Sequence, residues 1–284
     1  MHPARIAELL EPFLNGQDQR PNTKHLIPHI LTYIDLLRRW NARINLTAIR
    51  DPEEIVTRHF GESLFTARRL FPSSTNAGTA ALGCPAERSA AAVRSLQGDR
   101  KEHGFSFHLA LSERGESKGA DLAALRDGAL AAEGNAEDLR ANAQHHPTVA
   151  DLGSGAGFPG IPIKLWAPNI SLTLIESNRK KAAFLREVVR ALTLTNVNVQ
   201  TARAETLPAG VFDLVTLRAV ERFSTILPIA ANLVAPAGRL ALLIGTAQLA
   251  QAQSALPYFL WHAPEPIPLS KSRILAVCCR PSGH

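Results

Sequence analysis

Apolar residues recur every three or four positions through the first seventy residues, which is the period of an amphipathic helix. The repeat is clearest over residues 27–40. Asp51 and Pro52, followed by two glutamates, form a typical helix start, and the helical pattern then continues to Leu70. Residues 1–72 are therefore predicted to form a helical extension.

Short strand-like runs alternate with helical runs from residue 147 onward. Helices are expected over residues 180–194 and 225–234. Because parallel strands need crossover connections, this alternation predicts an α/β domain over 147–284, with a mainly parallel sheet and helices on both faces. The tail is expected to end in a strand pair, 264–269 and 273–279. The five expected parallel strands are 149–152, 172–176, 197–201, 212–217 and 239–244.

The segment between these two regions, residues 73–146, has a different amino-acid composition. It is rich in alanine, contains scattered glycines and has few large apolar side chains. Such a segment buries too little apolar surface to offset the entropy lost when a backbone becomes ordered. We therefore expect a flexible insertion.

The composition narrows the class of protein. The 284 residues carry a formal net charge of +6, which favours polyanions such as nucleic acids as partners. The three cysteines show neither Cys-x-x-Cys spacing nor a His/Cys cluster, so we expect a reduced, cytoplasmic chain without a metal site. No run of about 20 apolar residues is present, so no membrane contact is expected. We also expect a monomer.

The first expected strand ends in a glycine-rich turn over residues 151–160, Asp-Leu-Gly-Ser-Gly-Ala-Gly-Phe-Pro-Gly. Gly153 and Gly155 let the backbone turn sharply and approach a ligand closely. In an open parallel sheet, this position is the ligand crevice. A carboxylate at Asp151 would attract the amine or sulfonium of S-adenosylmethionine and would repel a pyrophosphate. The turn therefore predicts S-adenosylmethionine as cofactor.

A dinucleotide is the alternative cofactor. Residues 155–160 also satisfy Gly-x-Gly-x-x-Gly, a weak pattern when it stands alone. Phe158 and Pro159 make this a poor pyrophosphate turn. Glu176, at the end of the second expected strand, can accept hydrogen bonds from ribose hydroxyls of either cofactor. A nucleotide-linked oxidoreductase therefore stays open as a second hypothesis.

Two further strand ends carry candidate site residues. Ala204 and Glu205 follow the third strand, where they can receive an adenine ring and its amine, although a solvated strand end fits the spacing nearly as well. Arg218 ends the fourth strand beside the same crevice. It can hydrogen-bond guanine O6, contact a phosphate or hold the cofactor. The structural alternative is an ion pair with Asp213 or Glu221.

The residues around the crevice lack the groups that some methylation reactions need. The fourth strand carries no Asn/Asp-Pro-Pro-aromatic motif for an exocyclic amine, and no cysteine is placed to attack a pyrimidine ring. Guanine N7 needs neither, because its lone pair lies exposed in the plane of the ring. Such a site works by aligning acceptor and donor, so no general acid, general base or nucleophile is expected.

The helical extension adds a basic surface and several polar or aromatic residues. Trp40 and His59 are by default structural, in the core or hydrogen-bonded within the fold. The basic residues can form a phosphate-contacting patch, although a solvated basic face is almost as well supported. A non-catalytic RNA-binding or assembly protein with a degenerate cofactor fold is a third hypothesis, motivated by Ile244 at the end of the last parallel strand and by the long insertion. The patch would comprise Arg38, Arg39, Arg43, Arg50, Arg58, Arg68, Arg69, Arg179, Lys180 and Lys181.

Five ordered motifs resemble the bacterial ribosomal RNA small subunit methyltransferase G family, also called the glucose-inhibited division protein B family. The resemblance covers residues 20–71 and 147–280, and it implies a class I S-adenosylmethionine-dependent methyltransferase fold, Rossmann-like, with an N-terminal helical extension. It also implies methyl transfer to N7 of one guanine in the 16S RNA of the small ribosomal subunit. The motifs are residues 40–49, Arg58-His59-x-x-Glu62-Ser63, 151–160, Ala204-Glu205 and Leu217-Arg218-Ala219.

By matching position, the resemblance implies that Gly153, Phe158, Ala204, Glu205 and Arg218 are cofactor contacts. The sequence departs from the family pattern in three ways: Glu62 stands where the family usually has Asp, Ile244 stands where it usually has Lys, and the family lacks the insertion. The partner implied is small-subunit ribosomal RNA or the small ribosomal subunit itself.

Overall fold

The computed structural model describes residues 1–14, 25–72, 146–218 and 222–282. All of these residues except His146 belong to one compact unit. The predicted insertion, 73–146, lies almost entirely outside the described residues, so its flexibility stays a prediction.

The N-terminal segment is helical, as the apolar periodicity predicts. Its helices are α1 (Pro3–Leu14), α2 (Leu26–Asn41) and a continuous run of three pieces: α3 (Pro52–Glu54), a π-helical segment η2 (Ile55–Gly61) and α4 (Glu62–Leu70). Asp51 caps this run as expected, because its side chain accepts a hydrogen bond from the backbone N–H of Glu54 at 2.7 Å. In the part of the chain that the structure describes, no helix is long and apolar enough to cross a membrane.

An eight-stranded sheet forms the centre of the unit. Its parallel strands lie in the order β3 (Val197–Gln200), β2 (Ser171–Ile175), β1 (Thr148–Leu152), β4 (Phe212–Arg218), β5 (Val234–Gly245). Strand β8 (Arg273–Cys279) pairs antiparallel with β5. The mainly parallel α/β fold is therefore confirmed.

The predicted pairing of strands in the tail is present, but the first strand of the pair is shorter than expected. Strand β7 covers only Glu265–Pro266 and pairs with β8, instead of spanning 264–269. The chain turns just after β7, where the N–H of Ser270 donates to the carbonyl of Ile267 and Leu269 has a φ of 59°, so the strand cannot extend to residue 269. A further short strand, β6 (Leu260–Trp261), also pairs with β8 and was not predicted.

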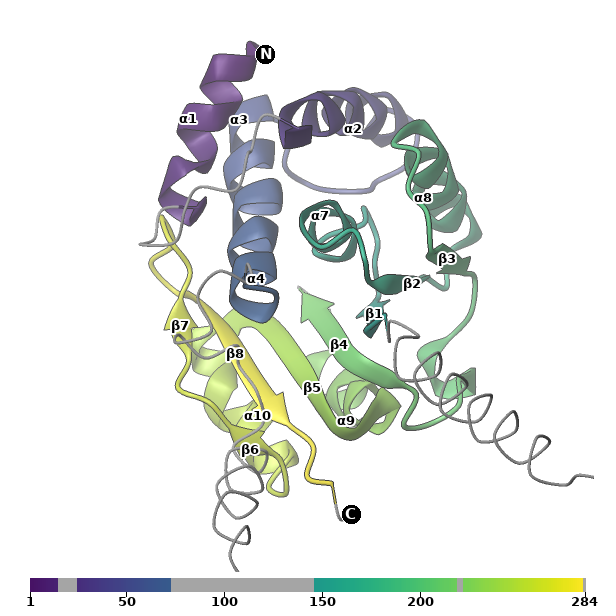
Figure 1. Cartoon of the computed structure of the whole chain (residues 1–284), viewed down its shortest axis with the longest axis vertical. Helices are drawn as coiled ribbons and strands as arrows, with labels where there is room; N and C mark the ends of the chain where they lie inside the picture. Colours follow the sequence, from purple (N-terminus) through teal and green to yellow (C-terminus); the bar gives the residue numbers. More distant parts are fainter. Residues whose placement is uncertain (15–24, 73–145, 219–221, 283–284) are drawn as a thin grey trace, which may run out of the picture. The chain divides into compact units, whose positions relative to one another are not determined.

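Helices cover both faces of the sheet (Figure 1). The connecting helices are α7 (Gly160–Trp166), α8 (Arg179–Ala191), α9 (Phe223–Leu233) and α10 (Leu249–Ala255), with short turns η3 (Ala204–Thr206) and η4 (Thr246–Gln248). One hydrophobic core unites α1, α2 and α4 with α7, α8 and one face of the sheet. A second core packs α9 and α10 on the other face. The N-terminal helices are thus packed as an integral layer of the fold.

Candidate active site

The glycine-rich turn connects the end of β1 to the start of α7. Gly153, Gly155 and Gly157 have φ values of 69°, 53° and 86°, which other residues rarely adopt. The backbone N–H groups of Gly153 and Ser154 donate to the carbonyl of Ile175 at 2.9 and 3.1 Å, which ties the turn to the end of β2. A Cβ atom at Gly153 would meet no atom within 4 Å, so this side of the turn is open to a ligand.

Glu176, which follows β2, holds the glycine turn through hydrogen bonds. Its two carboxylate oxygens accept hydrogen bonds from the backbone N–H groups of Gly155 and Asn178, at 2.9 and 2.7 Å. The candidate ribose contact is therefore placed next to the glycine turn. That contact itself stays a prediction.

Asp151 is 1% exposed and lies beneath the turn. Its carboxylate accepts hydrogen bonds from the N–H of Gly160 at 3.2 Å and from the hydroxyl of Thr216 at 2.8 Å. Burial raises the pKa of this carboxyl to about 6, and the hydrogen bonds from Thr216 and Gly160 oppose that rise. Asp151 therefore holds the turn against β4, and its attraction for a cationic cofactor remains a prediction.

Arg218, the last residue of β4, meets the helical extension. Its Nη2 donates to the backbone carbonyl of Arg58 at 2.6 Å and to His59 Nδ1 at 3.1 Å, and lies 3.2 Å from a carboxylate oxygen of Glu62. Among the described residues the ion-pair partner is Glu62, and Asp213 instead accepts hydrogen bonds from Thr148; Glu221 lies outside these residues. Burial lowers the pKa of Arg218 to about 10, so the side chain stays charged.

Glu62 joins three arginines around one buried carboxylate. Its side chain is 1% exposed and lies 3.1 Å from Arg58 and 3.2 Å from both Arg218 and Arg273. Within the described ranges, Nε and Nη1 of Arg218 find no hydrogen-bond partner, although they are buried. The cluster therefore combines excess positive charge with donors that a bound acceptor can satisfy.

Aromatic residues of the extension pack on the glycine turn. The ring of Phe158 stacks on Tyr33, with centroids 5.1 Å apart, and on His59, with centroids 4.7 Å apart. The Tyr33 hydroxyl donates to the carbonyl of Ala156. Sequence reasoning missed Tyr33, which carries no motif of its own. Trp40 is structural, as expected, because it packs on Phe184 and donates to Glu187.

A pocket of about 230 Å³ lies at the glycine turn. The candidates Gly153, Gly155, Phe158 and Arg218 all line it, together with Leu46, Thr47, His59, Ser154, Ala156 and Lys181. Ala204 and Glu205 lie in η3 and do not line this pocket; the first is buried and the second exposed. The structure thus brings four of the candidates together, with Glu176 and Asp151 behind the turn.

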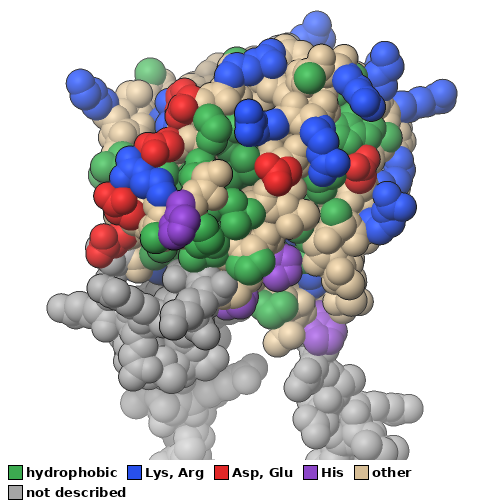
Figure 2. Space-filling model, turned by 90° about the horizontal axis from the view of Figure 1, so that it is seen from above, with side chains coloured by type: hydrophobic (Ala, Val, Ile, Leu, Met, Phe, Trp, Pro, Cys, Tyr) green, Lys and Arg blue, Asp and Glu red, His purple; other side chains and the backbone are tan. Residues whose placement is uncertain are grey.

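The basic residues of the extension divide into two groups. Arg58, Arg68 and Arg69 are engaged within the fold: Arg58 with Glu62, Arg68 with the Leu14 carbonyl and Arg69 with Glu265. The others are mostly exposed on and around α2 and α8, on the face of the molecule where Figure 2 shows many Lys and Arg side chains, with acidic ones gathered mainly at the left. The exposed members are Arg38, Arg39, Arg43, Arg50, Arg179 and Lys180.

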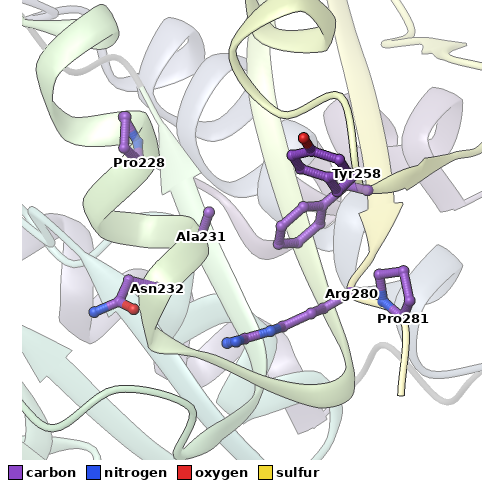
Figure 3. Close-up of a pocket in the computed structure, with 7 residues that line it drawn as sticks. Pro228, Ala231, Asn232, Tyr258, Arg280 and Pro281 are labelled. Atoms are coloured by element: carbon purple, nitrogen blue, oxygen red, sulfur yellow. The ribbon is translucent and has the colours of Figure 1, made fainter. Parts of the chain in front are cut away.

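A second pocket, of about 270 Å³, lies between α9 and the end of β8 (Figure 3). Tyr258, Asn232 and Arg280 are among its lining residues. Arg280 donates to the carbonyl of Val234, where β5 begins, so this pocket lies at the edge of the sheet opposite the carboxyl ends of the parallel strands. It contains no residue that the sequence singled out.

His59 gives the fold a pH dependence that can be measured. Burial and the charges of Arg218, Arg58 and Arg273 lower its pKa from 6.5 to about 3. Below pH 6.5 the unfolded chain binds a proton that the folded one does not, so stability falls as the pH falls, by about 1.4 kcal/mol per pH unit. Urea unfolding of wild type and of His59→Gln measures this effect. We expect the free energy of unfolding of wild type, minus that of the variant, to fall by about 2 kcal/mol between pH 6.5 and pH 5.

Asp151 has the opposite effect on how stability depends on pH. Its raised pKa contributes stability that is fully present below pH 3.8 and is lost as the pH rises through about 6. Because both proteins in the comparison retain Asp151, its contribution cancels. A difference that is constant with pH would show that His59 titrates normally in the folded protein.

Comparisons with known proteins find a family model and individual relatives that match this chain. A model of the family described as rRNA small subunit methyltransferase G matches residues 26–83 and 137–262. The chain is 32% identical over 237 residues to the ribosomal RNA small subunit methyltransferase G of Stenotrophomonas maltophilia, covering 83% of this chain and 76% of the relative. It is 31% identical over 255 residues to the protein of that name from Halorhodospira halophila, covering 89% and 87%. A solved ribosomal protein L11 methylase from Lactobacillus delbrueckii is 19% identical, with a TM-score of 0.41, over 49% of this chain and 72% of that one.

Proposed function

Because the chain belongs to the ribosomal RNA small subunit methyltransferase G family, we propose that it transfers the methyl group of S-adenosylmethionine to N7 of one guanine in small-subunit ribosomal RNA. The observation that carries this proposal is the pocket at the carboxyl ends of β1 and β4, lined by the glycine turn, Arg218 and the extension. The substrate is RNA, either free or within the small subunit. We further propose that the protein works in the cytoplasm, where its RNA substrate is found, and that it is a monomer.

The residues of the pocket fit S-adenosylmethionine. The buried Nε and Nη1 of Arg218 lack partners within the described ranges, and the carboxylate of a methionine moiety can accept from them. Gly153 leaves open space above the turn, and Glu176 stands at the strand end that a ribose approaches. We assign cofactor contacts to Gly153, Gly155, Phe158, Glu176 and Arg218, with Asp151 acting electrostatically from beneath. Ala204 and Glu205 would extend the site toward an adenine.

The chemistry requires alignment and no proton transfer before attack. When bound, the cofactor supplies an electrophilic methyl group on a sulfonium. Guanine N7 has an exposed lone pair, so no base must remove a proton from it. The residues of the chain hold the two reactants in line and exclude water, which is the source of rate in such a site. The low pKa of His59 supports this assignment, because a neutral, hydrogen-bonded histidine adds no further positive charge to that of Arg218 and Lys181 in the pocket.

A dinucleotide cofactor is disfavoured by the hydrogen bonds of the turn. In a pyrophosphate site, backbone N–H groups at the helix start face the phosphates. Here the N–H of Gly155 donates to Glu176 and that of Gly160 donates to Asp151. Two carboxylates therefore hold the donors that a pyrophosphate would need, and their charge would repel it.

Labelled S-adenosylmethionine and small subunits that lack the modification provide the test. We expect label to appear in N7-methylguanine of the ribosomal RNA. Gly153→Asp should abolish transfer, because it introduces a charged side chain at a positive φ on the open side of the turn. Binding of RNA to the basic face should survive this change. A variant that still transfers label would remove the turn from the site, and label in another base would refute the N7 assignment.

A further inference from the structure

A chain of hydrogen bonds leads from Arg218 to the loop that follows α2. Arg218 Nη2 donates to His59 Nδ1 at 3.1 Å. A guanidinium has donors only, so Nδ1 is the acceptor, and the proton of the neutral ring lies on Nε2. Nε2 is 2.8 Å from the hydroxyl oxygen of Thr47 and therefore donates to it.

The Thr47 oxygen receives a second hydrogen bond, from the backbone N–H of Ile49 at 3.1 Å. A hydroxyl accepts two hydrogen bonds and donates one, so both lone pairs are used and only the proton remains. No acceptor for this proton is found among the residues that the structure describes. Because Thr47 lines the pocket, its hydroxyl is a donor available to a ligand there.

The loop that carries Thr47 is held in place by one side chain. The carbonyl oxygen of the Asn41 side chain accepts from the N–H groups of Leu46 and Thr47, at 2.9 and 3.1 Å, and its amide group donates to the Thr47 carbonyl at 2.9 Å. Asn41 is buried. The donor is therefore preorganised, and its direction is fixed before a ligand binds.

We propose that the Thr47 hydroxyl donates to O6 of the guanine that is methylated, and so selects guanine and positions N7. This inference rests on the proposed function. Guanine O6 and N7 are neighbouring acceptors on one edge of the base, so a donor to O6 leaves the N7 lone pair free for the methyl group. Thr47 comes from the extension, whereas the residues assigned to the cofactor come from strand ends and the glycine turn.

The charges of the two donors support this division. Arg218 is charged and suits the carboxylate of the cofactor, whereas Thr47 is neutral and suits a neutral carbonyl. Adenine carries an amine, which is a donor, where guanine carries O6. At Thr47 this amine would meet another donor, because both acceptor positions of the hydroxyl are taken. The pocket therefore rejects adenine.

The test compares Thr47→Val, which removes the hydroxyl at similar size, with Thr47→Ser, which retains it. At saturating S-adenosylmethionine, we expect Thr47→Val to lower kcat/KM for unmodified small subunits about tenfold, and Thr47→Ser to retain most of it. Affinity for S-adenosylmethionine, measured by calorimetry, should change less than threefold. Thr57→Val is the matched control, since its hydroxyl donates to the Glu53 carbonyl away from the pocket, and it should retain wild-type kcat/KM.

A chemical double-mutant cycle separates this contact from a structural effect of the loop. Small subunits are reassembled around RNA carrying 2-aminopurine, which lacks O6 but keeps N7, at the methylated position. We expect this change to slow wild type about tenfold and Thr47→Val less than threefold. Independent, multiplying losses would overturn the proposal, as would a tenfold weaker affinity for S-adenosylmethionine in Thr47→Val. If wild type methylates no guanine in unmodified subunits, the proposed function itself fails, and this inference fails with it.

Discussion

Glu62→Gln is expected to lower the free energy of unfolding by about 3–5 kcal/mol, since Glu62 is the buried carboxylate that the three arginines of the cluster share. The Glu62 carboxylate lies within 3.2 Å of Arg58, Arg218 and Arg273, and it is 1% exposed. A neutral amide removes the salt-bridge partner of the buried Arg218 guanidinium. Urea unfolding at neutral pH measures the loss, and methyl transfer should fall as Arg218 loses its fixed position.

Two controls sharpen this prediction. Glu54→Gln removes an exposed carboxylate 3.8 Å from Arg58 and should cost less than about 1 kcal/mol. Glu62→Asp restores the residue that is usual in the family and retains the charge, so we expect it to keep most of the activity. If Glu62→Gln proved as stable as Glu54→Gln, the cluster would not depend on its carboxylate.

Gly157→Ala is expected to destabilise the fold by about 2–4 kcal/mol, from backbone strain together with overpacking. Gly157 has φ 86°, and a Cβ atom there would overlap the Tyr33 hydroxyl and lie 2.7 Å from Ile161 Cδ1. Because the turn must shift to make room, affinity for S-adenosylmethionine should fall more than tenfold. Urea unfolding and calorimetry measure the two effects.

Gly153→Ala is the matched control for strain alone. Gly153 has φ 69°, but its Cβ would meet no atom within 4 Å, so we expect a cost of about 1–2 kcal/mol. In a Tyr33→Phe background, which removes the overlapping hydroxyl, Gly157→Ala should cost less than in wild type. Equal costs at both glycines in wild type would show that Tyr33 does not constrain the turn.

Sequence periodicity predicted most of the fold because its signals are local. The alternation of short apolar runs located the five parallel strands, and Asp51 with Pro52 located a helix start. Strand β7 was overestimated because an apolar run containing prolines carries no information on how far the ladder extends. The helical periodicity of the extension likewise could not tell that it shares a hydrophobic core with the sheet.

The candidate site was only partly predictable for the same reason. The glycine turn can be recognised from ten consecutive residues, whereas the partners of Arg218 lie about 160 positions earlier in the chain. Only the family resemblance linked these segments. The structure also shows what surrounds Ile244, which stands where the family usually has Lys. Ile244 is buried and pairs with Ile274 across the sheet. The guanidinium of Arg273, next to Ile274, reaches Glu62. A positive charge is therefore present near this position in a different residue.

The contact between Tyr33 and Ala156 joins residues 123 positions apart, and it has a consequence for how the protein folds. During synthesis the helices of the extension emerge before the glycine turn and the sheet face that complete their core. Strand β1 begins at Thr148, whereas the last of these helices ends at Leu70. Contacts of such long range slow folding, because a long loop must close before they form. The newly made extension therefore exposes apolar side chains until the glycine turn leaves the ribosome, and this interval is when the chain is most prone to aggregate or to need a chaperone.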